Sequence, residues 1–387
     1  MLGATGNRNV TGDAINNNHA LVGALRQAGI RINGSDPWDI QINHPGTLER
    51  ILSGGSLALG ESYMDGWWDA ASVDAMITKL LRAKLNRKLF KWRTLLQIVV
   101  RKIVNLQSEA RAWEVGAQHY DIGNDLYERM LDPWMAYSCG YWKQADTLAQ
   151  AQEAKLDLIC RKLDLKPGMR VLDIGCGWGS WMRFAAKRYG VSAVGLTISK
   201  EQARYAAERS VGLDLEYRLE DYRAFNRDGA ARFDRVVSVG MFEHVGLKNY
   251  RDYFSVARRS LTGAGMFLLH TIGIAKSGQA ANPWINKYIF PNGVIPSAAE
   301  IARTVEPYFL IEDWHNFGSD YDQTLMAWLA RFDDAWPQLA ERYDERFRRM
   351  WRYYLMICAG AFRSRQCQLW QLVLSPDGLE GGYRRPE

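Results

Sequence analysis

The stretch that decides the fold is VLDIGCGWG, residues Val171–Gly179. An apolar run, Met169–Ile174, predicts a buried strand and leads directly into glycines spaced G-x-G-x-G. A glycine-rich turn between a strand and a helix lets a ligand approach the backbone closely. The stretch therefore predicts a ligand-binding loop formed by Gly175, Gly177 and Gly179. The alternative is a tight turn with a structural role only.

The chemistry around this loop disfavours a dinucleotide ligand. A dinucleotide-binding loop has the spacing G-x-G-x-x-G, which is absent here. The next predicted strand, Val191–Leu196, leads into Thr197, with no acidic residue to hold a ribose. Asp173, just before the loop, suits a cationic or amino-bearing ligand better than a phosphate. These residues disfavour a dehydrogenase and fit a sulfonium amino acid.

Strands and helices alternate on both sides of this loop. The rhythm, with one strand every 20 to 30 residues or so, indicates a doubly wound α/β sheet. The further predicted strands are Leu215–Leu219, Phe233–Val239 and Gly265–Thr271, and the predicted helices are Asp157–Asp164, Ser180–Tyr189 and Lys200–Arg209. A long aromatic insertion, Ile274–Pro296, has the length of a functional lid.

The N-terminal part has a different pattern and predicts a smaller, mainly helical domain. Residues 1–18 are polar and rich in Asn, which predicts disorder. Short strands and turns are expected over Ile30–Gly55. The expected helices are His19–Gly29, Leu48–Leu52, Val73–Arg82 and Thr94–Leu106. A boundary between about Ser108 and Gln118 divides the chain into domains 19–112 and 113–387.

The net charge of +6 is concentrated in one segment. Ala75–Gln107 holds nine basic residues and no acidic one, so the remainder of the chain has a net charge of −3. Apolar residues such as Phe90 and Trp92 alternate with these charges, as in helices that lie on a membrane surface. We expect this segment to meet an anionic surface. The alternatives are a solvated helix face packed on the rest of the protein, or nucleic-acid binding, which has no supporting motif.

The cysteines and the N-terminus indicate a cytoplasmic protein with reduced thiols. The five cysteines show no Cys-x-x-Cys spacing, so neither a metal site nor a redox motif is expected. Their number is odd, and the N-terminus lacks the apolar region of a signal peptide. No apolar run reaches the length of a membrane-spanning helix.

Four motifs together resemble the cyclopropane-fatty-acyl-phospholipid synthases and, more distantly, the mycolic acid cyclopropane synthases. They are LDIGCGWG, GLTISKEQ (Gly195–Gln202), SVGMFEHVG (Ser238–Gly246) and HYDIGNDLYERMLDPWMAYSCGYW (His119–Trp142). GSLALGESYMDGWWD (Gly55–Asp69) is similar to the phospholipid enzymes and is absent from the shorter mycolate enzymes. The resemblance runs from about Ala20 to the C-terminus and implies a Rossmann-like class I methyltransferase fold.

This resemblance implies S-adenosylmethionine as the cofactor. Tyr137 and Ser138 would cover its methionine end, and Val171–Gly179, including Asp173, would form the floor of its site. Thr197 and Gln202 would contact the ribose and the amino-acid moiety. Glu220 and Asp221 would lie beside the adenine, where an oxygen acceptor suits the adenine amino group. The alternative for these two acids is a solvated strand end.

The resemblance also implies the reaction. A methyl group is added to a cis double bond of a phospholipid acyl chain, and the carbocation that forms loses a proton to enzyme-bound bicarbonate, which closes a cyclopropane ring. The implied bicarbonate ligands are Cys139, Glu243, His270, the backbone of Ile272, and Tyr321, with protons shared among them.

Glu243 and His270 also stand out from the sequence alone, because each follows an apolar strand. The alternative for either is a buried polar residue with a structural role. His244, next to Glu243, is expected to point elsewhere. Cys358 is marked in descriptions of the family as an active-site thiol, but the reaction needs none, and a small buried side chain is the alternative. Aromatic residues around the carbocation are expected among Tyr137, Tyr141, Trp142, Phe242, Tyr288, Phe290, Trp314, Phe317 and Tyr321.

The expected partner is unsaturated phospholipid in an anionic membrane surface, reached by a homodimer that associates peripherally with the inner face of the cytoplasmic membrane. Two other functions stay open. One is a small-molecule N-methyltransferase of the same fold. The other is a non-catalytic lipid-binding protein, which the set Asp173, Gln202, Glu243 and His270 disfavours.

Overall fold

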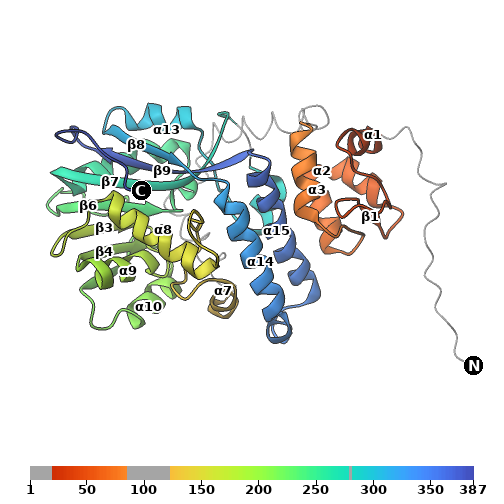
Figure 1. The fold of residues 1–387 in the computed structure, drawn as a ribbon, viewed down its shortest axis with the longest axis horizontal. Helices are drawn as coiled ribbons and strands as arrows, with labels where there is room; N and C mark the ends of the chain where they lie inside the picture. Colours follow the sequence, from red (N-terminus) through yellow and green to blue (C-terminus); the bar gives the residue numbers. More distant parts are fainter. Residues whose placement is uncertain (1–19, 85–122, 279–280) are drawn as a thin grey trace, which may run out of the picture.

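The centre of the protein is a seven-stranded sheet with strand order β5-β4-β3-β6-β7-β9-β8 (Figure 1). The structure is a computed structural model that describes residues 20–84, 123–278 and 281–387. Strands β3 to β7 are parallel to one another, and β9 runs antiparallel to both β7 and β8. The strands are β3 (Arg170–Ile174), β4 (Ser192–Thr197), β5 (Leu215–Leu219), β6 (Phe233–Val239), β7 (Leu261–Ile274), β8 (Leu310–Asn316) and β9 (Cys367–Ser375).

Both faces of the sheet are apolar, because successive side chains of its buried strands point to opposite sides. Val171, for example, packs with α8 and α9, whereas its neighbour Leu172 packs with α11 and α13. These layers are formed by α8 (Leu148–Lys162) and α9 (Ser180–Tyr189) on one face and α11 (Tyr250–Ser260) and α13 (Ala298–Val305) on the other. Helix α10 (Lys200–Glu208) packs on β4 and β5.

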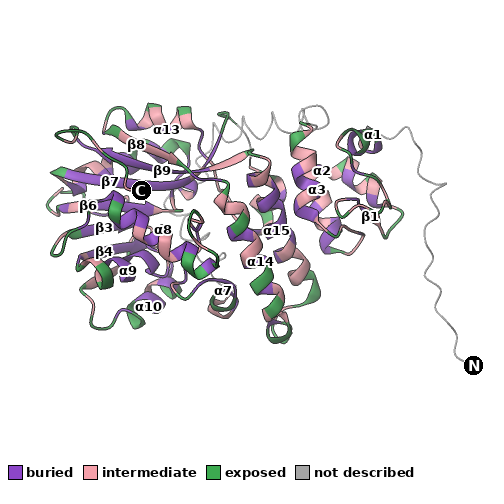
Figure 2. Ribbon diagram, viewed as in Figure 1, coloured by how far each residue is buried: buried purple, intermediate pink, exposed green. Residues whose placement is uncertain are grey.

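Beyond one end of the sheet, a helical layer joins the N-terminal elements to the sheet and its flanking helices (Figure 1). Helix α15 packs on α14 and, in turn, contacts α2 and α3. Both α2 and α3 have buried segments (Figure 2), and Met64 of α2 and Met76 of α3 belong to one buried apolar cluster with residues of α15. The elements are α1 (Ala20–Gln27), β1 (Gln41–Ile42), α2 (Thr47–Met64), β2 (Trp68–Asp69), α3 (Val73–Arg82), α7 (Asn124–Met130), α12 (Pro283–Tyr288), α14 (Asp320–Leu339) and α15 (Glu345–Arg363), with short 3-10 turns η2 (Phe242–His244) and η3 (Leu247–Asn249).

The predicted doubly wound α/β sheet is confirmed, including its five predicted strands, but the N-terminal prediction missed one helical segment. The expected short helix at Leu48–Leu52 lies in the first of the two helical pieces of α2, and the second piece, which ends at Met64, was not predicted. Gly55, with a φ of 63°, interrupts the helical backbone and forms the kink between the two pieces. The predicted disorder of residues 1–18, the helix Thr94–Leu106 and the boundary at 108–118 lie outside the described residues. Within the described ranges, no helix is long and apolar enough to cross a membrane.

Candidate active site

A single cavity of about 1560 Å³ connects the sheet with the N-terminal helices. At one end it is lined by the glycine loop and by residues that follow β4, β5 and β6. At the other end it is lined by leucines and isoleucines of α1, α2 and α3. Residues of α15 line the part of the wall between the two ends. The carboxyl ends of parallel strands are the usual ligand site of an open α/β sheet. The cavity therefore combines a polar, cofactor-like end with an apolar end.

The three glycines of the loop all have positive φ values, 86° at Gly175, 54° at Gly177 and 71° at Gly179. A Cβ atom on Gly175 would collide with Met241, and one on Gly179 would collide with Tyr217. A Cβ on Gly177 would meet no atom within 4 Å. The outer glycines thus allow close packing of the loop, and the middle one leaves backbone accessible to a ligand.

Asp173 and Lys155 place two ionisable groups at the floor of the cavity. Asp173 is 3% exposed, and its Oδ1 atom has no hydrogen-bond partner among the described residues. Burial raises the pKa of Asp173 to about 8, against the opposing effect of Lys155. Burial also lowers the pKa of Lys155 to about 8, although nearby Asp132 acts in the other direction. A cationic ligand would offset the desolvation cost of the Asp173 carboxylate and lower its pKa.

Lys155 was not among the predicted site residues, although it lines the cavity. It extends from α8, where its Nζ atom donates to Ser138 Oγ at 2.8 Å. The sequence carried a weak indication of this position, because Lys155 lies four residues after Ala151 and four before Ile159, both of which are buried. A lysine on the buried face of a helix is exceptional and marks a position for inspection.

The residues that follow β4 form a hydrogen-bonded cluster. Thr197 Oγ1 donates to Gln202 Oε1 at 3.0 Å, which leaves the Gln202 amide N–H groups as donors. Ser199 caps α10 by accepting from the Gln202 backbone N–H at 3.3 Å. Both predicted side chains, Thr197 and Gln202, line the cavity. The cap fixes the first turn of α10 and so positions Gln202 beside the loop.

The two acids after β5 differ in their surroundings, although both line the cavity. Asp221 is buried, and its Oδ2 atom accepts from Arg223 Nη2 at 2.6 Å. Its other oxygen, Oδ1, accepts from Arg223 Nε at 2.8 Å. Both oxygens of the Asp221 carboxylate therefore already accept hydrogen bonds from Arg223. Glu220 is held through its backbone N–H, which donates to the Thr197 carbonyl at 3.0 Å, so its side chain is the more accessible acceptor.

Glu243 follows β6, whereas His270 lies within the neighbouring strand β7, opposite Val239, and not after it as expected. Both are buried, and of the two only Glu243 lines the cavity. Glu243 Oε1 accepts from the Ile272 backbone N–H at 2.6 Å, whereas Oε2 has no partner among the described residues. Burial raises the pKa of Glu243 to about 7. Burial lowers the pKa of His270 well below its usual value, so the ring is neutral at pH 7. Its Nδ1 atom lies 3.1 Å from Gln371 Nε2, while its Nε2 atom has no partner among the described residues.

Tyr321 lines the cavity, and Cys139 lies in the same apolar cluster as Ile272 and Tyr321. Cys139 is fully buried and does not reach the cavity surface. Its Sγ atom donates to the Gly140 carbonyl at 3.2 Å. The structure thus brings Glu243, Ile272 and Tyr321 together at the cavity wall and places Cys139 behind them.

The expectation that His244 points away from the site is wrong, because His244 lines the same cavity as Glu243. Phe242–His244 forms the 3-10 turn η2 rather than extended backbone, so neighbouring side chains do not alternate between opposite faces. Cys358 also lines the cavity, and burial raises the pKa of its thiol far above the usual range. Its thiol is therefore protonated at pH 7, and a protonated thiol is a poor nucleophile.

Of the aromatic residues expected in the pocket, Tyr137, Phe290 and Tyr321 line the cavity. Trp142, Phe242, Tyr288 and the other expected aromatics do not line it. The sequence-based prediction missed a further set of aromatic lining residues, namely Trp178, Trp181, Tyr222, Tyr353, Tyr354 and Phe362. Tyr353, Tyr354 and Phe362 come from α15, for which the sequence offered no link to the site.

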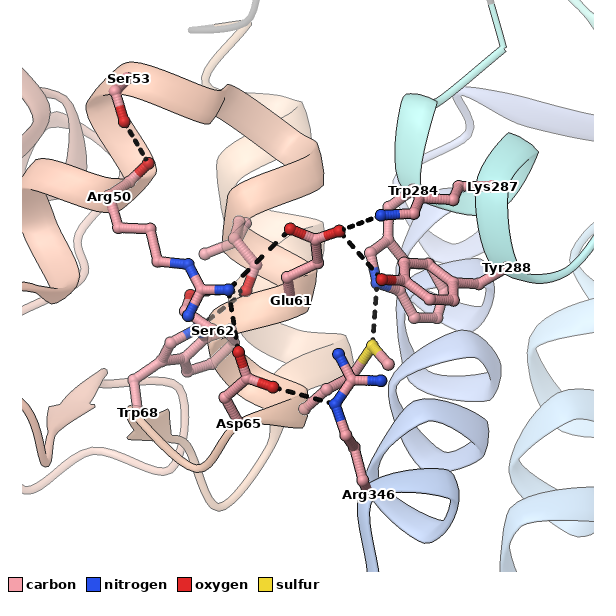
Figure 3. Close-up of polar contacts among 12 residues, drawn as sticks. Arg50, Ser53, Glu61, Ser62, Asp65, Trp68, Trp284, Lys287, Tyr288 and Arg346 are labelled. Atoms are coloured by element: carbon pink, nitrogen blue, oxygen red, sulfur yellow. Dashed lines mark hydrogen bonds and ion pairs between the residues drawn. The ribbon is translucent and has the colours of Figure 1, made fainter.

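Helix α12, in the insertion that follows β7, is held against the N-terminal helix α2 (Figure 3). Glu61 of α2 accepts from Lys287 Nζ at 2.7 Å and from the Tyr288 hydroxyl at 2.9 Å. Trp284 is fully buried against Gly60, and its Nε1 atom lies 3.3 Å from Met64 Sδ. The same insertion contributes Asn282, Pro283 and Ile285 to the cavity wall. Helix α2 thus supports a segment of the active site.

These features define a class: the fold, the glycine loop and the buried acid before it are those of a class I, S-adenosylmethionine-dependent methyltransferase. The family model described as "Mycolic acid cyclopropane synthetase" matches residues 107–372. The chain is 58% identical over 361 residues to "Cyclopropane-fatty-acyl-phospholipid synthase" of Escherichia coli (strain K12), which covers 93% of each protein. The chain therefore belongs to the cyclopropane synthase family.

Solved structures agree with this assignment. The mycolic acid cyclopropane synthase CmaA1, complexed with SAH and CTAB, matches with a TM-score of 0.63 at 33% identity, over 68% of this chain and 97% of that one. Coclaurine N-methyltransferase matches with a TM-score of 0.68 at 21% identity, over 82% and 98% of the two chains. At this lower identity, the second match shows the shared fold alone.

Proposed function

We propose that the protein transfers the methyl group of S-adenosylmethionine to the cis double bond of unsaturated phospholipid acyl chains and closes a cyclopropane ring. The observation that carries the proposal is the single cavity that joins Asp173 and the glycine loop to an apolar end between α2, α3 and α15. A cationic, polar cofactor and a long apolar chain need such opposite ends. The relative from Escherichia coli, which the chain matches over 93% of that protein's length, is named as a synthase that acts on fatty-acyl phospholipids, and this name supports the same substrate class.

The residues at the polar end suit the cofactor. The Asp173 carboxylate would face its cationic groups, and Gln202 amide N–H groups would donate to ribose hydroxyls. Glu220 would accept from the adenine amino group, because Asp221 is already held by Arg223. Tyr137 and Ser138 would cover the methionine end, since α8 holds their segment through Gln152 Nε2, which donates to the Ser138 carbonyl at 2.7 Å.

The residues around Glu243 suit a bicarbonate ion. Glu243 Oε2 and His270 Nε2 are buried without partners in the described part of the chain. Glu243 and Tyr321 line the cavity, whereas His270 does not. A protonated Glu243, a neutral His270 and Tyr321 can all donate to one anion. The Ile272 N–H would be shared between this anion and Glu243 Oε1. When bound, S-adenosylmethionine supplies an electrophilic methyl group and bicarbonate supplies a base.

The chain itself must keep water away from the cation that develops on the acyl chain, because water would convert it to an alcohol. Tyr137, Phe290 and Tyr354 enclose this part of the cavity with aromatic rings. The ring of Phe290 contacts Tyr354, with centroids 5.8 Å apart. Aromatic faces also stabilise a cation that has lost its water. In this proposal Cys358 is a lining residue without a covalent role.

Access to the substrate requires contact with a bilayer. We propose that the basic segment 75–107 attracts an anionic leaflet, each Lys or Arg contributing about 1 kcal/mol near the surface. A homodimer would present two such segments, which raises the effective affinity. Association with the inner face of the cytoplasmic membrane follows from this proposal.

The test is to incubate the protein with S-adenosylmethionine and vesicles of unsaturated phospholipid. A mass increase of one CH₂ per chain, with loss of the vinyl proton signals, is the expected result. Methylation of an added amine without loss of vinyl protons would instead favour an N-methyltransferase. Cosedimentation that increases with anionic lipid and decreases with salt is expected for the basic segment, and indifference to both would exclude that role.

A further inference from the structure

Four exposed cations stand around the apolar end of the cavity, which we call the cationic rim: Arg82, Lys84, Lys276 and Arg365. Each of them lines the cavity. They come from three separate elements, namely the C-terminal end of α3, the segment after β7 and the turn between α15 and β9. Two of them, Lys276 and Arg365, lie outside the basic segment 75–107.

A side-chain hydrogen bond and a strand pairing bring these elements together. Arg82 Nη2 donates to the Arg363 carbonyl at 3.2 Å, which joins the end of α3 to the end of α15. Cys367 at the start of β9 pairs with Ile274 at the end of β7. The residues just before Cys367 and just after Ile274 therefore leave the sheet side by side, which places Arg365 near Lys276. The rim is thus one site built from distant parts of the chain.

Within the ranges that the structure describes, the rim cations have no acidic partners, in contrast to many other exposed arginines. No carboxylate of the described residues forms an ion pair with any of the four, whereas Arg188, for example, pairs with Glu153 at 2.9 Å. The carboxylates that line the cavity, Asp173, Glu220, Asp221 and Glu243, belong to its other, cofactor end. Uncompensated cations at a cavity entrance attract an anionic group.

The surface immediately inside the rim is apolar. Leu80 and Leu81 of α3, Ile357 and Phe362 of α15, and Ile274 of β7 line the cavity there. A ligand that fits both surfaces has an anionic head joined to an apolar chain.

We propose that the cationic rim binds the phosphodiester of the phospholipid whose acyl chain occupies the cavity. This inference rests on the proposed function and adds a substrate-recognition site to it. Arg supplies paired N–H donors to phosphate oxygens and Lys supplies a point charge. The contact would anchor the head at the entrance and fix how deeply the chain enters, which places the double bond at a set distance from the rim.

The experiment compares two substrates with the same unsaturated chains, dioleoylphosphatidylethanolamine and dioleoylglycerol, each dispersed in neutral detergent micelles. Neutral micelles carry no net surface charge, so attraction to an anionic surface is removed and only the phosphodiester differs. The double variant Lys276→Gln/Arg365→Gln is compared with the wild type. The matched control is Lys200→Gln/Arg251→Gln, which removes the same charge from exposed positions that do not line the cavity.

The wild type is expected to favour the phospholipid at least tenfold in kcat/KM, mainly through KM. The rim variant is expected to lose most of this preference, and the control variant to keep it. A rim variant that keeps the preference would overturn the proposal, as would inhibition of both substrates to the same degree by 10 mM inorganic phosphate, which would indicate a free-anion site. If the wild type converts neither substrate, the proposed function itself fails.

Discussion

Asp173 carries an ionisable group into a fully buried position, and this has a thermodynamic consequence for the cofactor-free protein. Its pKa is about 8 in the folded protein, compared with an ordinary value of 3.8. Between these pH values the folded chain holds a proton that the unfolded chain releases. Stability therefore decreases as pH rises through this window, by up to about 1.4 kcal/mol per pH unit from this group.

Replacing Asp173→Asn is expected to abolish this part of the pH dependence, since the amide does not ionise. It should also lower the affinity for S-adenosylmethionine at least 100-fold, because the ligand loses its carboxylate partner. Urea unfolding of both proteins at pH 5.5 and 7.5, followed by tryptophan fluorescence, measures the first effect. Glu243 contributes a slope of the same sign in both proteins, so it cancels. An unchanged difference between the two pH values would contradict the burial argument.

Cys358 and Glu243 line one cavity but are expected to differ in their effect on turnover. Cys358→Ala should retain activity to within about threefold, because burial keeps the thiol protonated. Glu243→Gln should lower kcat at least 100-fold, since the amide can still accept from the Ile272 N–H but can neither take up nor release a proton. Both variants should bind S-adenosylmethionine like the wild type, which calorimetry checks. A 100-fold loss in Cys358→Ala would indicate a covalent role instead.

At the scale of elements, the contact between α12 and α2 joins the insertion to the N-terminal helices (Figure 3). Trp284→Ala should cost about 3–5 kcal/mol of stability, as for other large aromatic residues removed from a packed interior. Lys287→Ala should cost less than about 1 kcal/mol, because its ion pair with Glu61 is partly exposed to solvent. Thermal unfolding of both variants distinguishes packing from ion pairing. Equal losses in the two variants would show that the ion pair, not the indole, holds the insertion.

The elements that the sequence predicted are those with an uninterrupted pattern. The strands β3 to β6 and the helices α9 and α10 were predicted close to their observed bounds, because apolar runs and helical spacing marked them. Strand β8, with the sequence LIEDWHN, lies at the sheet edge and is only partly buried, so it has no apolar run. Helix α2 was obscured by Gly54, Gly55 and Gly60, which serve as a kink and as a contact surface for Trp284.

The candidate site was predictable only where residues follow strands. Asp173, Gln202 and Glu243 lie near strand ends, so strand order alone brought them to one edge of the sheet. Lys155 and the aromatic residues of α15 reach the cavity from helices. Helical spacing predicts which face of a helix is buried, but not which other element or cavity that face contacts. His244 lines the cavity because Phe242–His244 forms the 3-10 turn η2, and no sequence pattern predicted this turn.

At the scale of the whole molecule, the cavity is lined jointly by α2, α3 and the catalytic part, so the N-terminal helices should influence which acyl chains react. Leu57 of α2 lines the cavity and is not fully buried. In Leu57→Trp the larger side chain would occupy space at the apolar end, far from Asp173. The variant should therefore bind S-adenosylmethionine normally but convert long acyl chains at least tenfold more slowly.

The effect should depend on how far the chain extends beyond its double bond. Chains with a short segment beyond the double bond need less of the apolar end, so they should be converted by Leu57→Trp nearly as fast as by the wild type. Leu57→Ala, which enlarges the same region, serves as the matched control and should retain the long substrates. Competition between two phospholipids of different chain length, analysed by mass spectrometry, measures the ratio directly. An equal slowing of both substrates by Leu57→Trp would mean that α2 affects folding or docking rather than the acyl-chain site.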